Sequence, residues 1–272
     1  MTTLNIIGCG RAARTCARLW VQQDLLTVGE VLTRSPQSAA EAVRFIGQGQ
    51  AVSTYEALNA APLWLLGVPD REIAPTVAAL AASGTLRSGD GVFHLSGFTS
   101  SEILAPLRAA GVRTASVHPV MSFADPQRAI ERFAGTPCGV EGEASLAAEL
   151  TQLFAAVGGT PFPLDGNEKP LYHAGSVFAS NFLVVILDAA RRAYVDAGVP
   201  PEMAERMLAT LSRGALENVI ALDAAAALTG PAARGDREVV SAQHAAVTRW
   251  DPEAGEAYDA LSRLAFRLAG RR

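Results

Sequence analysis

The first part of the chain alternates short apolar runs with segments of helical spacing. Apolar runs at 4–7, 28–32 and 63–68 predict buried strands, and the segments between them predict helices over 11–23 and 38–45. Further strands are predicted at 92–95, 114–117, 136–141 and 160–164, with helices over 73–82 and 144–157. Strands separated by helices are typical of βαβ units, so we expect an α/β domain with a mostly parallel sheet.

No convincing strand follows residue 165, and the pattern becomes helical. Helices are predicted over 168–197, over 201–222, from the 230–236 loop to about 249, and over 252–269. We therefore place a domain boundary at 165, with an α/β domain over 1–165 and an all-α domain over 166–272.

Composition narrows the class of protein. Of 272 residues, 49% are hydrophobic and 18% charged, which suits a buried core and excludes a disordered chain. A net charge of −4 argues against a nucleic-acid partner. The three cysteines lack zinc-site spacing and no signal peptide is visible, so we expect a cytoplasmic protein. The apolar stretch 171–190 contains polar residues and has no companion, so we interpret it as a buried helix rather than a membrane span.

A glycine motif follows the first predicted strand and opens the first predicted helix. It matches the dinucleotide fingerprint G-x-G-x-x-A with Gly8, Cys9, Gly10, Arg11, Ala12 and Ala13. Gly8 permits the tight turn, Gly10 lets a pyrophosphate approach the backbone, and Ala13 allows close helix packing. The helix N-terminus then offers N–H groups to the phosphates. The bland alternative is a glycine-rich turn of another α/β domain.

The end of the second strand favours NADP over NAD. An NAD site usually has a carboxylate here, whereas this chain has Thr33, Arg34 and Ser35. Arg34 is suited to a 2′-phosphate, and the hydroxyls of Thr33 and Ser35 add hydrogen bonds. Alternatively, Arg34 is a solvated loop arginine.

Later strand ends should line the nicotinamide side, because ligands of open parallel sheets bind at the carboxyl ends of strands. They carry Val68, Pro69 and Asp70 after one strand and Ser96 after the next. Asp70 is alternatively a helix N-cap, and Ser96 is either a turn residue or a substrate contact.

Two histidines in the sheet have different predicted roles. His94 lies inside an apolar strand and is interpreted as a satisfied core residue. His118 ends a strand and precedes Pro119, which favours an extended His118 at the carboxyl edge of the sheet. We therefore take His118 as a candidate substrate-cleft residue.

The long helix carries a polar stripe. At about 100° per residue, four residues fall within an arc of about 60°: Lys169, His173, Ser176 and Ser180, with Asn181 beside them. Lys169 is the only lysine, and a lysine in a dry site is a candidate proton donor or oxyanion partner. The alternative is that the stripe faces solvent. In the 230–236 loop, Arg234 is a candidate carboxylate ligand, or the loop is a helix-connecting turn capped by Asp236.

These motifs together resemble the 6-phosphogluconate dehydrogenase-like superfamily, which includes β-hydroxyacid dehydrogenases, pyrroline-5-carboxylate reductase and prephenate dehydrogenase. More closely, the chain resembles a bacterial subfamily assigned as NADP oxidoreductases, whose helical half is a domain of unknown function. The residues that carry this resemblance are His118-Pro119 with Ser122-Phe123, Tyr172-His173-Ala174 with Ser180-Asn181, and Gly230-Pro231 with Arg234-Gly235-Asp236.

The resemblance implies a Rossmann domain, a substrate site between domains and a homodimer formed through the helical half. Lys169 matches the catalytic lysine of the β-hydroxyacid dehydrogenases, but His173 stands where those enzymes have an asparagine. His118-Pro119 is similar to the His-Pro of prephenate dehydrogenase, without the glycine-rich continuation.

The resulting hypothesis is an NADPH-dependent reductase or dehydrogenase for a small polar carbonyl, hydroxy or imine substrate. Lys169 or His173 would donate the proton, and His118, Ser96, Asn181 and Arg234 would orient the substrate. The rival hypothesis is a non-catalytic NADP-binding regulator or scaffold. A redox function of Cys9 or Cys138 is weaker, because the chain has no C-x-x-C pair.

Overall fold

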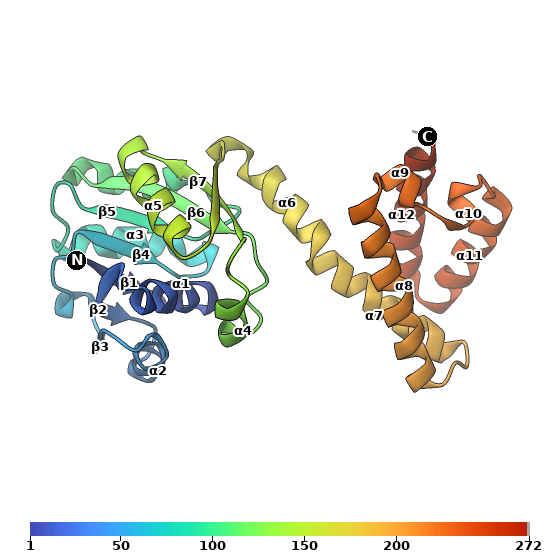
Figure 1. Cartoon of the computed structure of the whole chain (residues 1–272), viewed down its shortest axis with the longest axis horizontal. Coiled ribbons are helices and arrows are strands. Elements are labelled where there is room, and N and C mark those ends of the chain that lie inside the picture. The colour runs from blue at the N-terminus through green and yellow to red at the C-terminus, as the bar shows by residue number, and fades with distance from the viewer. Residues whose placement is uncertain (271–272) are drawn as a thin grey trace. The chain divides into compact units, whose positions relative to one another are not determined.

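The computed structural model describes residues 1–270, which divide after Ser180 into two compact units (Figure 1). The last strand ends at Pro163, close to the predicted boundary at 165. The division between the units lies later, because the helix that begins at Lys169 bonds to the sheet.

The first unit is built on one eight-stranded sheet. The strands run in the order β3-β2-β1-β4-β5-β6-β7-β8, parallel except between β6 and β7. They are β1 Thr2–Ile7, β2 Leu26–Leu32, β3 Gln50–Val52, β4 Leu63–Leu66, β5 Gly91–His94, β6 Arg113–Pro119, β7 Pro137–Gly142 and β8 Thr160–Pro163. The predicted α/β class with a mostly parallel sheet is confirmed, and the short edge strand β3 was not predicted.

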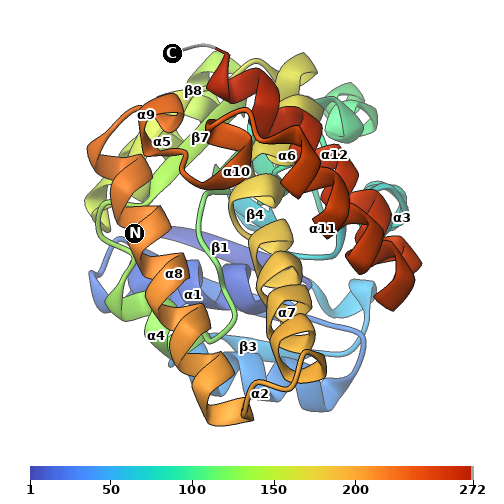
Figure 2. The same ribbon diagram turned by 90° about the vertical axis from the view of Figure 1, so that its right-hand side faces the viewer.

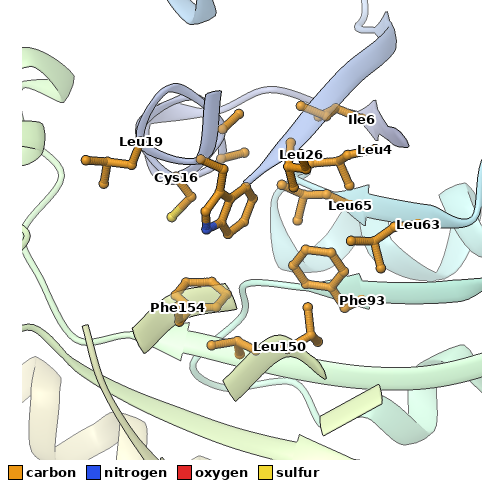
Figure 3. Packing of buried hydrophobic residues seen from close by; sticks show 14 of the residues in the cluster. Leu4, Ile6, Cys16, Leu19, Leu26, Leu63, Leu65, Phe93, Leu150 and Phe154 are labelled. Carbon is orange, nitrogen blue, oxygen red and sulfur yellow. The ribbon is translucent and has the colours of Figure 1, made fainter. Parts of the chain in front are cut away.

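Helices cover both faces of this sheet and create two apolar cores. Elements between the strands are α1 Arg11–Gln22, α2 Pro36–Ile46, η1 Tyr55–Ala57, α3 Asp70–Ser83, η2 Ser101–Ala110, α4 Pro126–Glu131 and α5 Ala144–Ala156. On one face, α1 and α5 pack on the strands, with Trp20 edge-on to Phe93 and Phe154 (Figure 3). On the other face, α3 and η2 enclose Trp64 and Val92.

The predicted helix over 168–197 is interrupted, which corrects the sequence-based interpretation. After the turn η3 Gly166–Glu168, helix α6 Lys169–Ala179 ends, and α7 Asn181–Asp196 begins after Ser180. The backbone of Ser180 leaves helical geometry at φ −126° and ψ −67°. Its hydroxyl donates to the Ser176 carbonyl oxygen at 2.7 Å, a local bond that competes with the helical ladder and bends helices.

The second unit is helical throughout its described part. It contains α7, α8 Pro201–Ala221, α9 Ala224–Ala227, α10 Gly230–Ala233, α11 Arg237–Trp250 and α12 Pro252–Ala269. Helix α7 lies beside α8, and α11 packs on α12 (Figure 2). The Trp250 indole donates to Asp196 at 2.7 Å, which ties the end of α7 to the end of α11. Asp236 caps α11 by accepting from the Val239 N–H, as the connecting-turn alternative predicted.

The apolar stretch is not buried within the chain, which corrects the expectation of a buried helix. Residues Gly166–Asp196 form the one stretch of the described chain that is long and apolar enough to cross a membrane, and its apolar part is not buried. Val184 and Val185 are 67% and 63% exposed. Apolar side chains occur around α7, whereas within its unit the helix packs mainly on α8, so part of that surface is left without cover.

Candidate functional site

The turn after β1 has the geometry of a dinucleotide fingerprint. Gly8 has a left-handed φ of +73°, and its N–H donates to the Leu32 carbonyl oxygen at 2.7 Å. A side chain on Gly8 would collide with Val68 in the loop after β4. A Cβ on Gly67 of the same loop would lie 2.5 Å from the Cβ of Ala13, so the small residue opening α1 is required by close packing. The structure thus has a tight turn at Gly8 and a close contact at Ala13, the two features that the fingerprint predicts for these positions.

The N-terminus of α1 is open to an anion. Gly10 is the N-cap residue and supplies no capping side chain, and the first turn contains no acidic residue. The N–H groups of Arg11, Ala12 and Ala13 find no partner among the described residues. Arg14 donates through Nε and Nη2 to the Cys9 carbonyl oxygen at 3.2 and 3.1 Å, which holds the loop and adds positive charge. These free donors and the helix dipole fit a pyrophosphate.

The cysteines have no redox geometry. Cys9, Cys16 and Cys138 are all buried and free. Burial raises the pKa of the Cys9 thiol to about 12, so Cys9 is a neutral filler of the glycine turn. This environment is opposite to that of a reactive thiolate.

The end of β2 leaves one unpaired cation. Ser35 caps α2 by accepting from the Ser38 N–H at 3.2 Å, and the Thr33 hydroxyl donates to the Ser35 carbonyl oxygen at 2.9 Å. Arg34 is exposed and forms no ion pair with any described residue. The nearby Glu30 carboxylate accepts from the Asn59 side chain at 2.7 Å. Arg34 therefore brings a guanidinium, without an ion-pair partner in the described part of the chain, next to the expected ribose position.

Strand register aligns the other candidates along one edge. Ile7 pairs with Leu66, Leu66 with His94, and His94 with Ser116. Two residues further on, the chain reaches Val68 after β4, Ser96 after β5 and His118 on β6. Neighbouring strands lie about 4.8 Å apart, so these residues share the carboxyl edge of the sheet with the glycine turn.

Two candidates at this edge have local structural roles. The Ser96 hydroxyl oxygen accepts from the N–H groups of Phe98 and Thr99 at 3.1 and 2.7 Å, so Ser96 stabilises the turn after β5. Asp70 is exposed and does not cap α3, whose N-cap residue is Pro69, so the capping alternative for Asp70 is wrong.

A histidine cluster joins β6 to α6. Nδ1 of His118 and the Tyr172 hydroxyl are 2.8 Å apart, and the rings of His118 and His173 meet edge to face with centroids 5.4 Å apart. Gly97 packs against both imidazoles, because a Cβ there would collide with His173 Nδ1 and lie 2.7 Å from His118 Nε2. Two ring nitrogens from different elements therefore converge beside the Gly97 backbone.

The surroundings of His118 and Tyr172 favour the neutral form of both side chains at pH 7. Burial lowers the pKa of His118 to about 4, with further lowering by the charges of His173 and Lys169. Burial raises the pKa of Tyr172 to about 12. Nδ1 of His173 is buried without a hydrogen-bond partner among the described residues. Such an atom costs free energy until it meets water or a ligand.

Lys169 lies in a closed environment. Its side chain has no exposed surface, and Nζ donates to the Ser116 hydroxyl at 2.6 Å and lies 3.4 Å from Glu141 Oε1. Burial lowers the pKa of Lys169, and the Glu141 carboxylate opposes that effect. His94 is also fully buried and satisfied by backbone groups, as predicted. The role of Lys169 as a proton donor stays a prediction, but its surroundings differ from those of an open donor.

The structure thus unites part of the predicted set. It brings His118 and His173 together and leaves Ser180 exposed at the end of α6. Lys169 contacts Ser116, two residues before His118 on β6. Asn181 is the first residue of the second unit. Sequence reasoning missed Glu141 as a partner of Lys169. The available signal was a carboxylate inside the predicted strand 136–141.

The comparisons agree with this architecture. A Rossmann-like domain model matches residues 2–119, and the model of DUF2520, a domain of unknown function, matches residues 136–265. No curated protein matches the sequence.

Solved structures match nearly the whole chain. TM1727 from Thermotoga maritima is 27% identical with a TM-score of 0.75, covering 99% of this chain and 100% of its own. BF3122 from Bacteroides fragilis, a candidate NADP oxidoreductase, is 20% identical with a TM-score of 0.80 and 98% coverage of both chains. Pyrroline carboxylate reductase from Plasmodium falciparum, solved with NADP bound, is 11% identical with a TM-score of 0.59 and 98% coverage of both.

The buried pair leads to a stability prediction. Glu141→Ala should lower the free energy of unfolding by about 3–5 kcal/mol, because it leaves the Lys169 ammonium buried without its counter-ion. Chemical denaturation monitored by circular dichroism measures the change. Glu149→Ala is the matched control, since it breaks a partly exposed pair with Arg113 and should cost less than about 1 kcal/mol. Equal losses in both variants would contradict the importance of burial.

Proposed function

Because the chain belongs to the proteins that join a Rossmann-like domain to DUF2520, we propose that it is an NADP(H)-dependent oxidoreductase acting on a small polar substrate. The substrate class is a carbonyl or imine, or the corresponding alcohol or amine. The observation that carries the proposal is the placement of an open helix N-terminus and a histidine cluster along one carboxyl edge. The NADP oxidoreductase and NADP-bound reductase among the similar structures support it.

The first unit supplies groups for each part of the nucleotide. The N–H groups of Arg11, Ala12 and Ala13 would bind the pyrophosphate, and Gly8 and Gly10 would leave room for it. Arg34 pairs with the 2′-phosphate through its planar guanidinium, beside Thr33 and Ser35. Val68, Pro69 and Asp70 line the nicotinamide side. When bound, the nicotinamide accepts or supplies the hydride at C4.

His118 is the group proposed to move the substrate proton. If Nδ1–H donates to the Tyr172 oxygen, the lone pair lies on Nε2, the atom beside Gly97 and His173. A neutral imidazole at pH 7 accepts the proton of a substrate hydroxyl or ammonium during oxidation and returns it during reduction. His173, whose buried Nδ1 has no hydrogen-bond partner among the described residues, would bind the substrate oxygen or nitrogen.

Nucleotide selectivity tests the cofactor. NADPH should raise the Tm more than NADH at equal concentration, because the nucleotide with the lower Kd stabilises the native state more. This stabilisation reaches about 2.7 kcal/mol at 100 times the Kd. Arg34→Ala should weaken NADPH binding roughly 10- to 100-fold, since a charge-assisted hydrogen bond is lost, and leave NADH binding unchanged. Arg132→Ala removes another exposed arginine as control. Equal shifts for both nucleotides would refute the role of Arg34, and no shift would refute the cofactor and favour a scaffold.

Turnover tests the histidine. A screen of hydroxy acids and cyclic amines with NADP⁺ should find a substrate, and His118→Gln should lower kcat by about 10²–10⁴-fold. Because the imidazole acts in its neutral form, kcat/KM of the native enzyme should persist below pH 6 and fall near pH 4, where His118 is protonated. His244→Gln in α11 is the control. Full turnover in His118→Gln would rule out the assignment.

We also propose that a second copy of the chain covers α7. This helix leaves a row of large apolar side chains exposed: Leu183, Val184, Val185 and Ile186. A soluble, cytoplasmic homodimer would remove them from water.

Light scattering after size exclusion tests this assembly. We expect a mass of about 57 kDa, twice the chain mass of 28.4 kDa. Val185→Glu should shift the protein toward monomer, because it places a charge in the apolar contact. Val239→Glu, an exposed valine of α11, should leave the dimer intact. A native monomer at micromolar concentration, or recovery with the membrane fraction, would overturn the proposal.

A further inference from the structure

Helix α6 contacts strand β6 at two points, and the spacing of the contacts matches the repeat of both the helix and the strand. Lys169 Nζ donates to the Ser116 hydroxyl at 2.6 Å, and the Tyr172 hydroxyl lies 2.8 Å from His118 Nδ1. Ser116 and His118 are two residues apart on β6 and therefore project from the same face of the strand. Lys169 lies three and four residues before Tyr172 and His173, so all three share one face of the helix.

The anion at the first docking point is fixed by the sheet itself. Glu141 on β7 pairs with Ser116 in the antiparallel register, which brings its carboxylate to the same place as the Ser116 hydroxyl. The backbone N–H and the hydroxyl of Ser101 both donate to this carboxylate at 2.7 Å. The receptor for the ammonium is therefore built from β6, β7 and η2, without any contribution from α6.

A buried ammonium in such a receptor is poorly suited to proton exchange with a substrate. Its side chain has no exposed surface, and its hydrogen bonds are directed into the protein. Removing it from its partners would leave charges unpaired inside the protein, a costly displacement. The same geometry makes the lysine a strong anchor for the first turn of α6.

We propose that Lys169 is a positioning residue, whose bonds to Ser116 and Glu141 fix α6 on the sheet and align Tyr172 and His173 with His118. This inference rests on the proposed function only in giving His118 the chemical role. The alignment itself is a property of the first unit.

The charge of Lys169 also acts on the cluster. Titratable groups near His118 come from three elements: Lys169, Tyr172 and His173 on α6, Cys138 and Glu141 on β7, and His94 on β5. Positive charge on Lys169 opposes protonation of His118 and of His94, so it lowers the pKa of both. Loss of that charge should therefore raise the pKa of His118.

Histidine NMR tests the proposal without any substrate. The chain has four histidines, so ring resonances of the labelled full-length protein can be assigned with His118→Gln, and His244 in the second unit serves as an internal reference. In Lys169→Met, the His118 titration midpoint should rise by on the order of 1 pH unit. Cross-peaks between the Tyr172 and His118 rings should weaken. Arg113→Met, which removes a partly exposed cation from the start of β6, should change neither.

The double variant Lys169→Met/Glu141→Gln guards against misfolding. It leaves no unpaired buried charge, so it should fold even if the single variant does not, with the same rise in the His118 midpoint. An unchanged midpoint and intact ring cross-peaks in either folded variant would overturn the positioning role.

Kinetics separate this inference from the proposed function. If a substrate is found, Lys169→Met should lower kcat, keep the KM for NADPH, and move the acid limb of the pH profile upward together with the NMR midpoint. Abolished turnover with an unchanged His118 titration would identify Lys169 as the proton donor and refute the inference. Absence of any turnover in the native protein would refute the proposed function, while the NMR result would still decide the role of Lys169.

Discussion

The arrangement of the candidate site depends on one buried ammonium. A charge without access to water must be paired and hydrogen-bonded inside the protein, and Lys169 meets that requirement only where the Ser116 hydroxyl and the Glu141 carboxylate meet. This restricts the start of α6 to one position on β6 and β7. Tyr172 and His173 then follow by helical periodicity, and His118 follows Ser116 by strand periodicity. The ion pair at the start of α6 therefore also aligns the side chains of Tyr172 and His173 with His118 at the edge of the sheet.

The parallel register supplies the second constraint. Residues far apart in the chain reach the same edge because β1, β4 and β5 end at paired positions, and β6 passes that level at Ser116 before it ends at Pro119. The glycine turn and the histidine cluster lie at opposite ends of the β1-β4-β5-β6 block, so a ligand of dinucleotide size is matched to the edge better than a small anion alone. Glycines at positions 8, 67 and 97 keep the edge free of side chains where loops, helix and imidazoles approach most closely.

Local patterns predicted the elements whose signals are local. The glycine fingerprint lies where the strand and helix predictions required it, and the predicted helix over 252–269 matches α12 Pro252–Ala269. Segments 50–52 and 126–131 were missed because they are too short for a periodic signal, and η2 contains Pro106, which disrupts an α-helical pattern. The environment of Lys169 could not be predicted, because its partners lie 53 and 28 residues away. The lysine was singled out by its rarity, which says nothing about its contacts.

The apolar stretch illustrates a different limit. Hydrophobic periodicity indicates that one face of a helix is removed from water. The pattern is the same whether that face packs against the same chain, another chain or lipid. Val184 and Val185 are more than half exposed although the helix was expected to be buried. The backbone leaves helical geometry at Ser180, in the middle of the stretch, and Asp188 forms ion pairs with Arg191 and Arg192 along α7. A span through hydrocarbon would have to bury those charges, whereas a contact with a second protein surface can leave them at its polar rim.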